Sequence, residues 1–414
     1  MTARRLGALV TLALVGMPAA ALAQVFDPAA LHAVVDVRAA AASGETSFTE
    51  EGFGKLRYGG GANAGGFSTA QLALAAVEWT PQLDWQWSAV VDAGYQPGQE
   101  NVVDLYQAYL SFKPTPRFGT RFRARIGYFY PPISLENDAR VWGVTDTITP
   151  SAINTWVGEE AKVAGGEATL SHDFSDQTLS ATLGLFGFDE TSGTLLAFRG
   201  WALHDIQGQL EGSFDLPPLS PKLATLQYDE TYSTREIDGR VGVYGQIEWR
   251  PAAPVAISAL YYDNNGDRTA VTPDLQWAWS TQFGEVGLQA QPNPHIRVTA
   301  EALTGRTAIG AAATPLADVS FTSAFVLASR DLGADTLSAR LDAFETRDNA
   351  PKPPTSLGEH GWSVLGAWRH PLAAHLDLRL EALHVVSTRP SRILAAEDPY
   401  QAQTEVQSSL RFSF

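Results

Sequence analysis

The segment EVQSSLRFSF occupies residues 405–414, and its polarity alternates from one residue to the next. Successive side chains of a β-strand point to opposite faces, so this alternation would give a strand two chemically different faces. One face carries Val406, Ser408, Leu410, Phe412 and Phe414, and the other carries Glu405, Gln407, Ser409, Arg411 and Ser413. The segment therefore predicts an amphipathic β-strand that ends at Phe414.

The same alternation recurs through the chain and is clearest in residues 85–95. One face of this segment is aromatic at both ends and aliphatic in the middle: Trp85, Trp87, Ala89, Val91, Ala93 and Tyr95. Trp and Tyr prefer the two interfaces of a bilayer, whereas small aliphatic side chains prefer its hydrocarbon core. Residues 85–95 therefore have the pattern of a strand that faces lipid.

Further amphipathic strands are expected in residues 121–130, 241–249, 337–343 and 376–380. A soluble sheet alternates as well, but two details favour a membrane barrel. The strands would run to about 10–13 residues, longer than the usual 5 or 6. Their polar faces also carry charges of both signs, which suits a water-filled lumen.

The first residues predict export. Arg4 and Arg5 precede an apolar run at residues 6–15, and residues 21–23 read Ala-Leu-Ala, a small-x-small cleavage pattern. This is the arrangement of a secretory signal peptide, with cleavage expected before Gln24. An uncleaved anchor is the alternative, although the apolar run is short for a spanning helix. We expect a signal peptide at 1–23 and one outer-membrane β-barrel at 24–414.

Composition agrees with this class. The chain is 18% charged and contains 36 Gly, 11 Trp, 12 Tyr and 19 Phe, as expected when half of the strand residues face lipid. It has no cysteine, which excludes disulfides, thiolate chemistry and cysteine-based metal sites. The formal net charge is −16, so nucleic acid is not an expected partner.

Connections of two kinds separate the expected strands. Compact turns rich in Pro, Gly or Asp lie at 80–84, 113–117, 173–176, 251–254, 292–294, 331–335 and 370–371. Longer connections lie near 42–64, 96–101, 131–164, 189–239, 266–272, 308–316, 347–359 and 389–401. Short periplasmic turns that alternate with longer external loops are typical of an outer-membrane barrel. The count predicts an all-β, antiparallel transmembrane barrel of about sixteen strands, or eighteen if residues 195–206 form a strand.

Three arginines form the most distinctive candidate site. Arg121, Arg123 and Arg125 alternate with Phe122 and Ala124, so a basic ladder would lie on one face of one strand. An arginine at the lipid midplane costs about 2–4 kcal/mol, which places the ladder in the lumen. Pore selectivity depends on such lining charges. The alternative is that the ladder only neutralises carboxylates across the lumen and stiffens the wall.

The strand with this ladder leads into the long connection 131–164, the third external loop. Its charged residues are Glu136, Asp138, Arg140, Asp146, Glu159, Glu160 and Lys162. Here the chain resembles the porin superfamily. The resemblance implies a third loop that folds inward and narrows the barrel opposite a basic wall. Arginines facing loop carboxylates would then set up a transverse field that orients solutes and sets ion preference.

A narrower resemblance lies at residues 127–136, GYFYPPISLE. This stretch is similar to the strand-to-loop passage of the phosphate-selective porin O/P-like group, whose hallmark is a set of lysines and arginines at the constriction. The three arginines of the ladder fit that hallmark, but the acidic balance of the chain does not. The terminal Phe412 and Phe414 resemble the assembly signal of outer-membrane barrels. These likenesses imply a homotrimer, surrounded by outer-membrane lipid and inserted by the barrel assembly machinery.

The connection 189–239 contains an unusually apolar stretch at residues 193–205. It could narrow the mouth with Arg199, Trp201 and His204 facing solute, or form a short helix that packs on the inner wall or on a neighbouring subunit. The remaining charges expected in the lumen suggest an ordinary solvated network: Glu248, Arg297, Glu301, Arg340, Asp342, Arg379, Glu381 and Arg411.

Enzyme signatures are missing from the sequence. It has no HExxH, Walker A, GxSxG or dinucleotide-binding glycine pattern, and no cofactor or metal is expected. The favoured hypothesis is an outer-membrane porin of a Gram-negative bacterium, through which small hydrophilic solutes or ions diffuse passively. The alternatives are a plugged structural or adhesive barrel that binds partners through its long loops, and a barrel enzyme.

Overall fold

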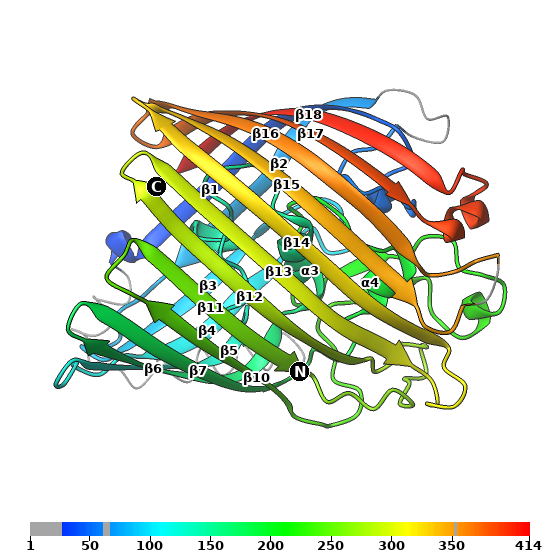
Figure 1. Cartoon of the computed structure of the whole chain (residues 1–414), viewed down its shortest axis with the longest axis horizontal. Coiled ribbons are helices and arrows are strands. Elements are labelled where there is room, and N and C mark those ends of the chain that lie inside the picture. The colour runs from blue at the N-terminus through cyan, green and yellow to red at the C-terminus, as the bar shows by residue number, and fades with distance from the viewer. Residues whose placement is uncertain (1–26, 61–66, 352–353) are drawn as a thin grey trace.

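The computed structural model describes residues 27–60, 67–351 and 354–414, so the expected signal peptide lies outside the described residues. Sixteen antiparallel strands form a closed barrel, in the order β1-β18-β17-β16-β15-β14-β13-β12-β11-β10-β7-β6-β5-β4-β3-β2 (Figure 1). The strands of the barrel are β1 (Leu31–Ser43), β2 (Phe67–Trp79), β3 (Trp87–Tyr95), β4 (Val103–Phe112), β5 (Thr120–Phe129), β6 (Val163–Phe174), β7 (Gln177–Gly187), β10 (Gly242–Arg250), β11 (Val255–Asp263), β12 (Ser280–Asn293), β13 (Ile296–Ile309), β14 (Ala317–Leu332), β15 (Asp335–Asp348), β16 (Glu359–Ala373), β17 (Leu376–Thr388) and β18 (Tyr400–Ser413).

The last strand closes the barrel against the first. β18 pairs with β1 in register from Val34↔Ser413 to Ser43↔Thr404. Its apolar side chains point outward, where Val406 is 54% and Phe412 41% exposed, whereas Glu405 on the opposite face is buried. An exposed apolar face around a buried polar interior is the inverse of a soluble sheet, and it suits a barrel whose outer surface meets lipid.

Short and long connections separate to opposite ends of the barrel. Seven short turns join β2–β3, β4–β5, β6–β7, β10–β11, β12–β13, β14–β15 and β16–β17, and eight longer connections join the other pairs. In Figure 1 the short turns lie at the left end and most of the long loops at the right end. The expected sixteen strands and the asymmetry of the turns are both confirmed.

Small elements outside the wall lie in the long connections. They are η1 (Pro28–Ala30), η2 (Phe48–Glu50), η3 (Arg140–Trp142), α3 (Ala152–Glu160), α4 (Thr194–Phe198), β8 (Ser213–Asp215), η4 (Leu223–Thr225), β9 (Glu230–Tyr232) and η5 (Pro390–Ala395). The ambiguous residues 195–206 contain helix α4 and no barrel strand, which excludes the eighteen-strand alternative. In the described part of the chain, no helix is both long and apolar enough to cross a membrane.

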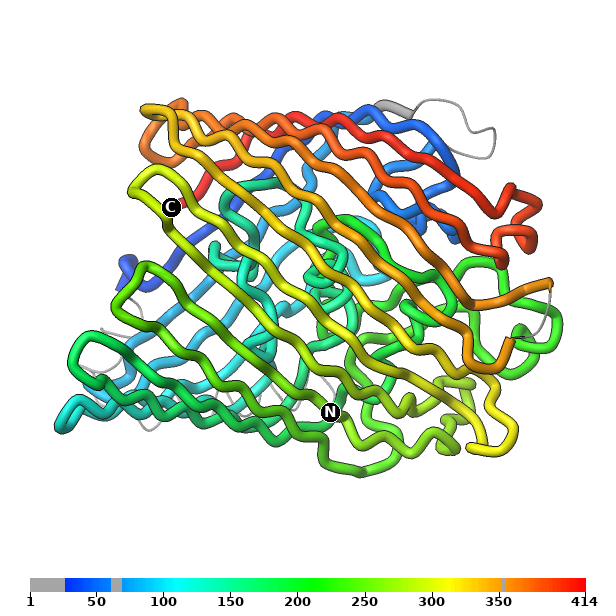
Figure 2. The backbone as a smooth tube through the Cα atoms, viewed as in Figure 1, coloured from blue at the N-terminus to red at the C-terminus, as the bar shows by residue number. Residues whose placement is uncertain are grey.

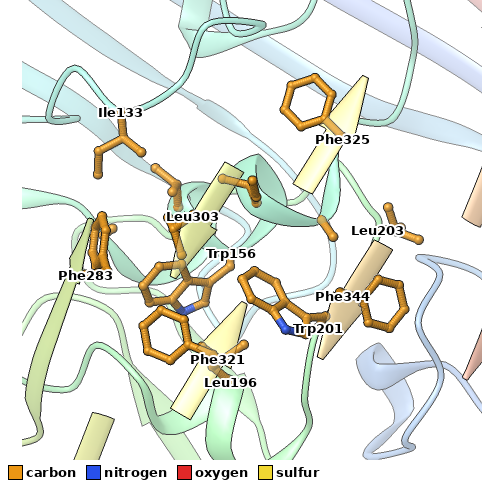
Figure 3. Packing of buried hydrophobic residues seen from close by; sticks show 14 of the residues in the cluster. Ile133, Trp156, Leu196, Trp201, Leu203, Phe283, Leu303, Phe321, Phe325 and Phe344 are labelled. Carbon is orange, nitrogen blue, oxygen red and sulfur yellow. The ribbon is translucent and has the colours of Figure 1, made fainter. Parts of the chain in front are cut away.

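The backbone trace in Figure 2 shows several of the connections running through the interior of the barrel. We name them by order: the first external loop is residues 44–66, the third is 130–162 and the fourth is 188–241. The main hydrophobic cluster lies between these loops and the inner wall. It joins Ile133, Trp156, Leu196 and Trp201 of the loops to Phe283, Leu303, Phe321 and Phe344 of the wall (Figure 3).

Candidate functional site

The third external loop crosses the lumen and binds the opposite wall. It leaves the barrel after β5, yet the guanidinium of Arg340 on β15 donates to the carbonyl of Thr149 at 2.6 Å. Arg379 on β17 donates to the carbonyls of Val144 and Thr147 at 3.2 and 3.1 Å. The expectation that this loop folds inward is thus confirmed.

Carboxylates of the far wall complete this attachment. Glu381 on β17 accepts the backbone N–H of Ile148 at 2.6 Å, and Asp342 on β15 accepts that of Ala152 at 3.1 Å. The second contact places a negative charge at the N-terminus of α3, where unpaired N–H groups favour an anion. Backbone groups of the loop, which would otherwise lose water inside the barrel, therefore find partners on the wall.

Helix α3 fills the middle of the lumen. Ser151 caps its N-terminus by accepting the N–H of Asn154 at 3.2 Å, and all nine residues of the helix are buried. The ring of Trp156 packs against Phe283 and Phe321, with centroids 5.4 and 5.3 Å apart. An apolar core inside a barrel excludes water from this level of the lumen.

The fourth external loop packs on α3 from the long-loop end. Arg389, directly after the end of β17, donates to the carbonyls of Ala197 and Phe198 at 2.7 and 3.0 Å, which holds the C-terminal end of α4. The rings of Trp201 and Trp156 meet edge to face, 6.1 Å between centroids. Helix α4 is wholly buried, so the apolar stretch packs on the inner wall, as one of the two sequence hypotheses stated.

The first external loop locks the other two in place. The backbone N–H of Leu203 donates to the carbonyl of Lys55 at 2.7 Å, and the ammonium of Lys55 lies 2.6 Å from Glu359 on β16. Asp205 of the fourth loop is held between Arg38 on β1 and Arg57 of the first loop, at 2.7 and 2.8 Å. Burial opposes ionisation of Asp205, but these two guanidiniums hold its pKa well below its usual range.

A buried cluster ties the fourth loop to α3. Arg199 donates to both oxygens of Glu159 at 2.6 and 2.5 Å, and Nε2 of His204 lies 2.8 Å from the same carboxylate. Nδ1 of His204 accepts the N–H of Ile206 at 3.2 Å, so the neutral ring carries its proton on Nε2, the nitrogen that lies 2.8 Å from Glu159. Burial lowers the pKa of His204 despite the opposing effect of Glu159. Burial also opposes ionisation of Glu159, but Arg199 and His204 lower its pKa to about 2.

The arginine ladder lies on β5 and pairs with its neighbour β6. Arg121 bonds to both oxygens of Asp173. Arg125 bonds to both oxygens of Glu167, at 2.9 and 2.8 Å. Arg123 is half exposed, and its nearest ion-pair contact is 3.9 Å from Glu167. Arg123 is therefore the rung with the weakest attachment to the wall.

The charged residues of the third loop bind elsewhere. Glu136 accepts the N–H of Ser151, Asp138 accepts the Thr145 hydroxyl, Arg140 pairs with Glu78, Asp146 pairs with Arg297, and Glu160 accepts the N–H groups of Gly193 and Leu195. Among the described residues, none of these loop carboxylates lies within ion-pair distance of the β5 ladder. The expected face-to-face arrangement of ladder and loop acids is not what the contacts show.

Arg199, Trp201 and His204 are all buried. None of the three faces solution, because each contacts α3, the first loop or the wall.

The expectation of a solvated charge network was wrong for the far wall. Arg340, Asp342, Arg379 and Glu381 are buried, because the third loop covers them and uses them as hydrogen-bond partners. The sequence does carry a signal for this set: an Arg and an acid two positions apart share one strand face, as in Arg340 with Asp342 and Arg379 with Glu381. In such a pair the Arg can donate to backbone carbonyls of a loop while the acid accepts backbone N–H groups of the same loop.

An open chamber lies at the short-turn end of the lumen. A cavity of about 400 Å³ is bounded by the third loop and by β10–β13. Asp138 and Asp146 line it from the loop, and Arg250 and Arg297 line it from the wall. The lumen therefore has a wet, charged compartment on one side of the packed loops.

The comparisons with known proteins agree with this architecture. No protein-family model matches the chain, and neither does any curated protein sequence. Among solved structures, the outer membrane channel DcaP of Acinetobacter baumannii is similar, with a TM-score of 0.56, 9% identity, and coverage of 94% of this chain and 99% of that chain. An anion-selective porin from Comamonas acidovorans gives a TM-score of 0.53 with 11% identity, covering 93% and 98%. A loop L8 deletion mutant of OmpT, an outer membrane protein of Vibrio cholerae, gives 0.52 with 9% identity, covering 93% and 99%.

Sequence identities of 9–11% support a shared fold alone. The chain has the closed sixteen-stranded β-barrel fold of the outer-membrane porins, as the sequence predicted, and this agrees with the expected location in the outer membrane of a Gram-negative bacterium.

Proposed function

We propose that the protein is an outer-membrane channel for small hydrophilic solutes and ions, and that its three inward-folded loops close the lumen in the described state. The observation that carries this proposal is the attachment of the third external loop to Arg340 and Arg379 on the far wall. A barrel of about sixteen strands is wide enough for an aqueous channel. In this chain, the loops rather than the wall decide whether water and solutes pass.

Charged side chains at the short-turn end would act on a permeating ion. Arg123 is half exposed on β5, and Arg297 lines the chamber beside Asp146. A charged constriction between low-dielectric walls concentrates ions of opposite sign. We propose an anion preference at Arg123, and the anion selectivity named for the Comamonas porin is consistent with it. Selectivity for phosphate is the narrower form of this hypothesis.

A plugged barrel that binds partners through its loops is the second candidate. The observation that favours it is the apolar packing of Trp156 and Trp201 against Phe283 and Phe321 across the lumen. If this packing never opened, the lumen would be permanently closed to water and solutes. The two candidates differ in one property, which is the electrical conductance of the folded protein.

Single-channel recording in planar bilayers tests the proposal. The channel hypothesis predicts brief or small openings in the wild type and larger ones when the third loop is released from the wall. A reversal potential across a salt gradient would give the sign of the selectivity, and Arg123→Ala should shift it toward cations. A folded barrel that stays silent even with the loop released would favour the plugged alternative.

Three further features belong to the same proposal. We propose that residues 1–23 are removed as a signal peptide on export. Phe412 on the outward face of β18 and Phe414 directly after this strand have ring centroids 5.7 Å apart and are exposed, so the barrel assembly machinery could bind them. We also propose a homotrimer, which cross-linking in native membranes would test.

A further inference from the structure

The two ends of the fourth external loop meet at the rim of the barrel. Asp189 and Arg235 form a parallel bridge, and the N–H of Glu190 donates to the carbonyl of Arg235 at 3.4 Å. The segment after β7 thus lies beside the segment that leads into β10. The part of the loop that fills the lumen, with α4 and Trp201, lies between these two segments.

Three carboxylates converge at this junction. Glu190 comes from the first segment, and Glu236 and Asp238 come from the second. One oxygen of each lies within 4.8 Å of the corresponding oxygens of the other two. In the described part of the chain, no Lys, Arg or His forms an ion pair with any of the three.

Glu190 supplies an independent observation that points to a ligand site. Its side chain is only 2% exposed, and its Oε1 is buried without a hydrogen-bond donor. The other oxygen accepts the backbone N–H groups of Ile237 and Asp238, the latter at 2.9 Å. A buried, unpaired carboxylate oxygen is costly, and neighbouring ionised carboxylates increase the cost.

The three ionised carboxylates repel one another at this distance. A divalent cation would remove the repulsion without a proton, since carboxylate oxygens are the ligands that hard cations prefer.

We propose that Glu190, Glu236 and Asp238 form a binding site for a divalent cation of the Ca²⁺ class. Glu236 is exposed and Asp238 partly exposed, so water can complete the six to eight ligands that Ca²⁺ takes. Mg²⁺ demands a tighter octahedral arrangement, which a site assembled from two loop segments is less suited to hold. The bound ion would join both ends of the fourth loop and stabilise its inward position. This inference does not depend on the protein being a channel.

Calorimetric titration with CaCl₂ tests the proposal on the folded full chain in detergent after removal of divalent ions by EDTA. The wild type should bind one Ca²⁺ per chain, and its melting temperature should rise with CaCl₂. Glu190→Gln should lower the affinity at least tenfold. Asp238→Asn should do the same and serves if the buried variant fails to fold. Glu100→Gln is the matched control, because Glu100 is an exposed acid on another loop and its variant should bind as the wild type does.

Absence of saturable Ca²⁺ binding in the folded wild type would overturn the proposal. Equal binding by Glu190→Gln, Asp238→Asn and the wild type would overturn the assignment of the site. Tighter binding of MgCl₂ than of CaCl₂ would overturn the assigned class of cation.

Discussion

Replacing Arg340 by Met removes the guanidinium that joins the third external loop to β15. The side chain is fully buried, donates to the carbonyl of Thr149 at 2.6 Å and pairs with Asp342 at 2.9 Å. Met has a similar length and no charge, so the variant deletes the electrostatic contacts and keeps much of the packing.

The size of the effect follows from these two contacts. A hydrogen bond to a charged group contributes about 1.5–3 kcal/mol. Removing one partner of a buried ion pair costs about 3–5 kcal/mol. Asp342 keeps the N–H of Ala152 and the hydroxyl of Ser363, so we expect the free energy of unfolding to fall by about 3 kcal/mol, at the lower end of that range.

The hydrogen bond from Arg340 to the carbonyl of Thr149 is the contact that holds the third loop against β15. If about 2 kcal/mol of stabilisation is lost from the loop's closed position, the ratio of open to closed states rises about thirtyfold. Single-channel recording should show that rise as a longer total open time. Arg347→Met is the matched control, since Arg347 is 74% exposed and its one ion pair within the described residues is with Glu345.

A second variant distinguishes release of the loop from a general loss of stability. Arg340→Met with Asp342→Asn removes the charge that Arg340→Met leaves unpaired and keeps an acceptor for the N–H of Ala152 and the hydroxyl of Ser363, while the bond to Thr149 stays absent. This variant should regain most of the free energy of unfolding and still show the longer open time. A folded Arg340→Met protein with wild-type conductance would refute the reasoning.

Four further predictions follow from the described contacts. Trp156→Ala should lower the free energy of unfolding by about 3–5 kcal/mol in urea titration, because it leaves a cavity in the lumen core; Trp362→Ala, on the exposed outer face, should cost far less in detergent. Arg123→Ala should move the reversal potential in a KCl gradient toward cation preference, and an unchanged potential would exclude Arg123 from the ion path. Acidification from pH 8 to pH 5 should destabilise the wild type more than His204→Gln in thermal melts, because burial lowers the pKa of His204 in the folded protein. Below about pH 6.5 the unfolded ring takes up a proton that the folded ring does not take up. The contribution of His204 to the free energy of unfolding is therefore complete above that pH and is lost below it. Deletion of Phe414 should reduce the amount of heat-modifiable, folded barrel in outer-membrane fractions, and unchanged amounts would contradict an assembly role.

The wall of the barrel could be predicted because its signal is local. Outward residues such as Leu410 and Phe412 alternate with inward residues such as Ser409, and period-two patterning alone specifies a strand and its two faces. The short turns after these strands carry Pro, Gly or Asp for equally local reasons. Strand number, turn asymmetry and barrel closure therefore followed from the sequence.

The contents of the lumen could not be predicted in the same way. The contact between Thr149 and Arg340 spans 191 residues of sequence, and no local pattern specifies such a partner. Arg121 and Arg125 were recognised as lumen residues, but their pairing with Asp173 and Glu167 depends on the register of β6 beside β5. An inward-facing charge is thus readable from alternation, whereas its partner is set by the three-dimensional path of the loops.

The position and role of the third loop are tested most directly by tethering it. The chain has no cysteine, so Thr149→Cys with Gln407→Cys introduces the only two thiols. In the wild type, Nε2 of Gln407 on β18 donates to Oγ1 of Thr149 in the third loop at 3.2 Å. A short reducible thiol cross-linker should join the two thiols in the folded barrel and abolish channel openings, and reduction should restore openings at the wild-type level. Failure to cross-link in the folded protein, or openings that persist with the loop tethered, would contradict the account.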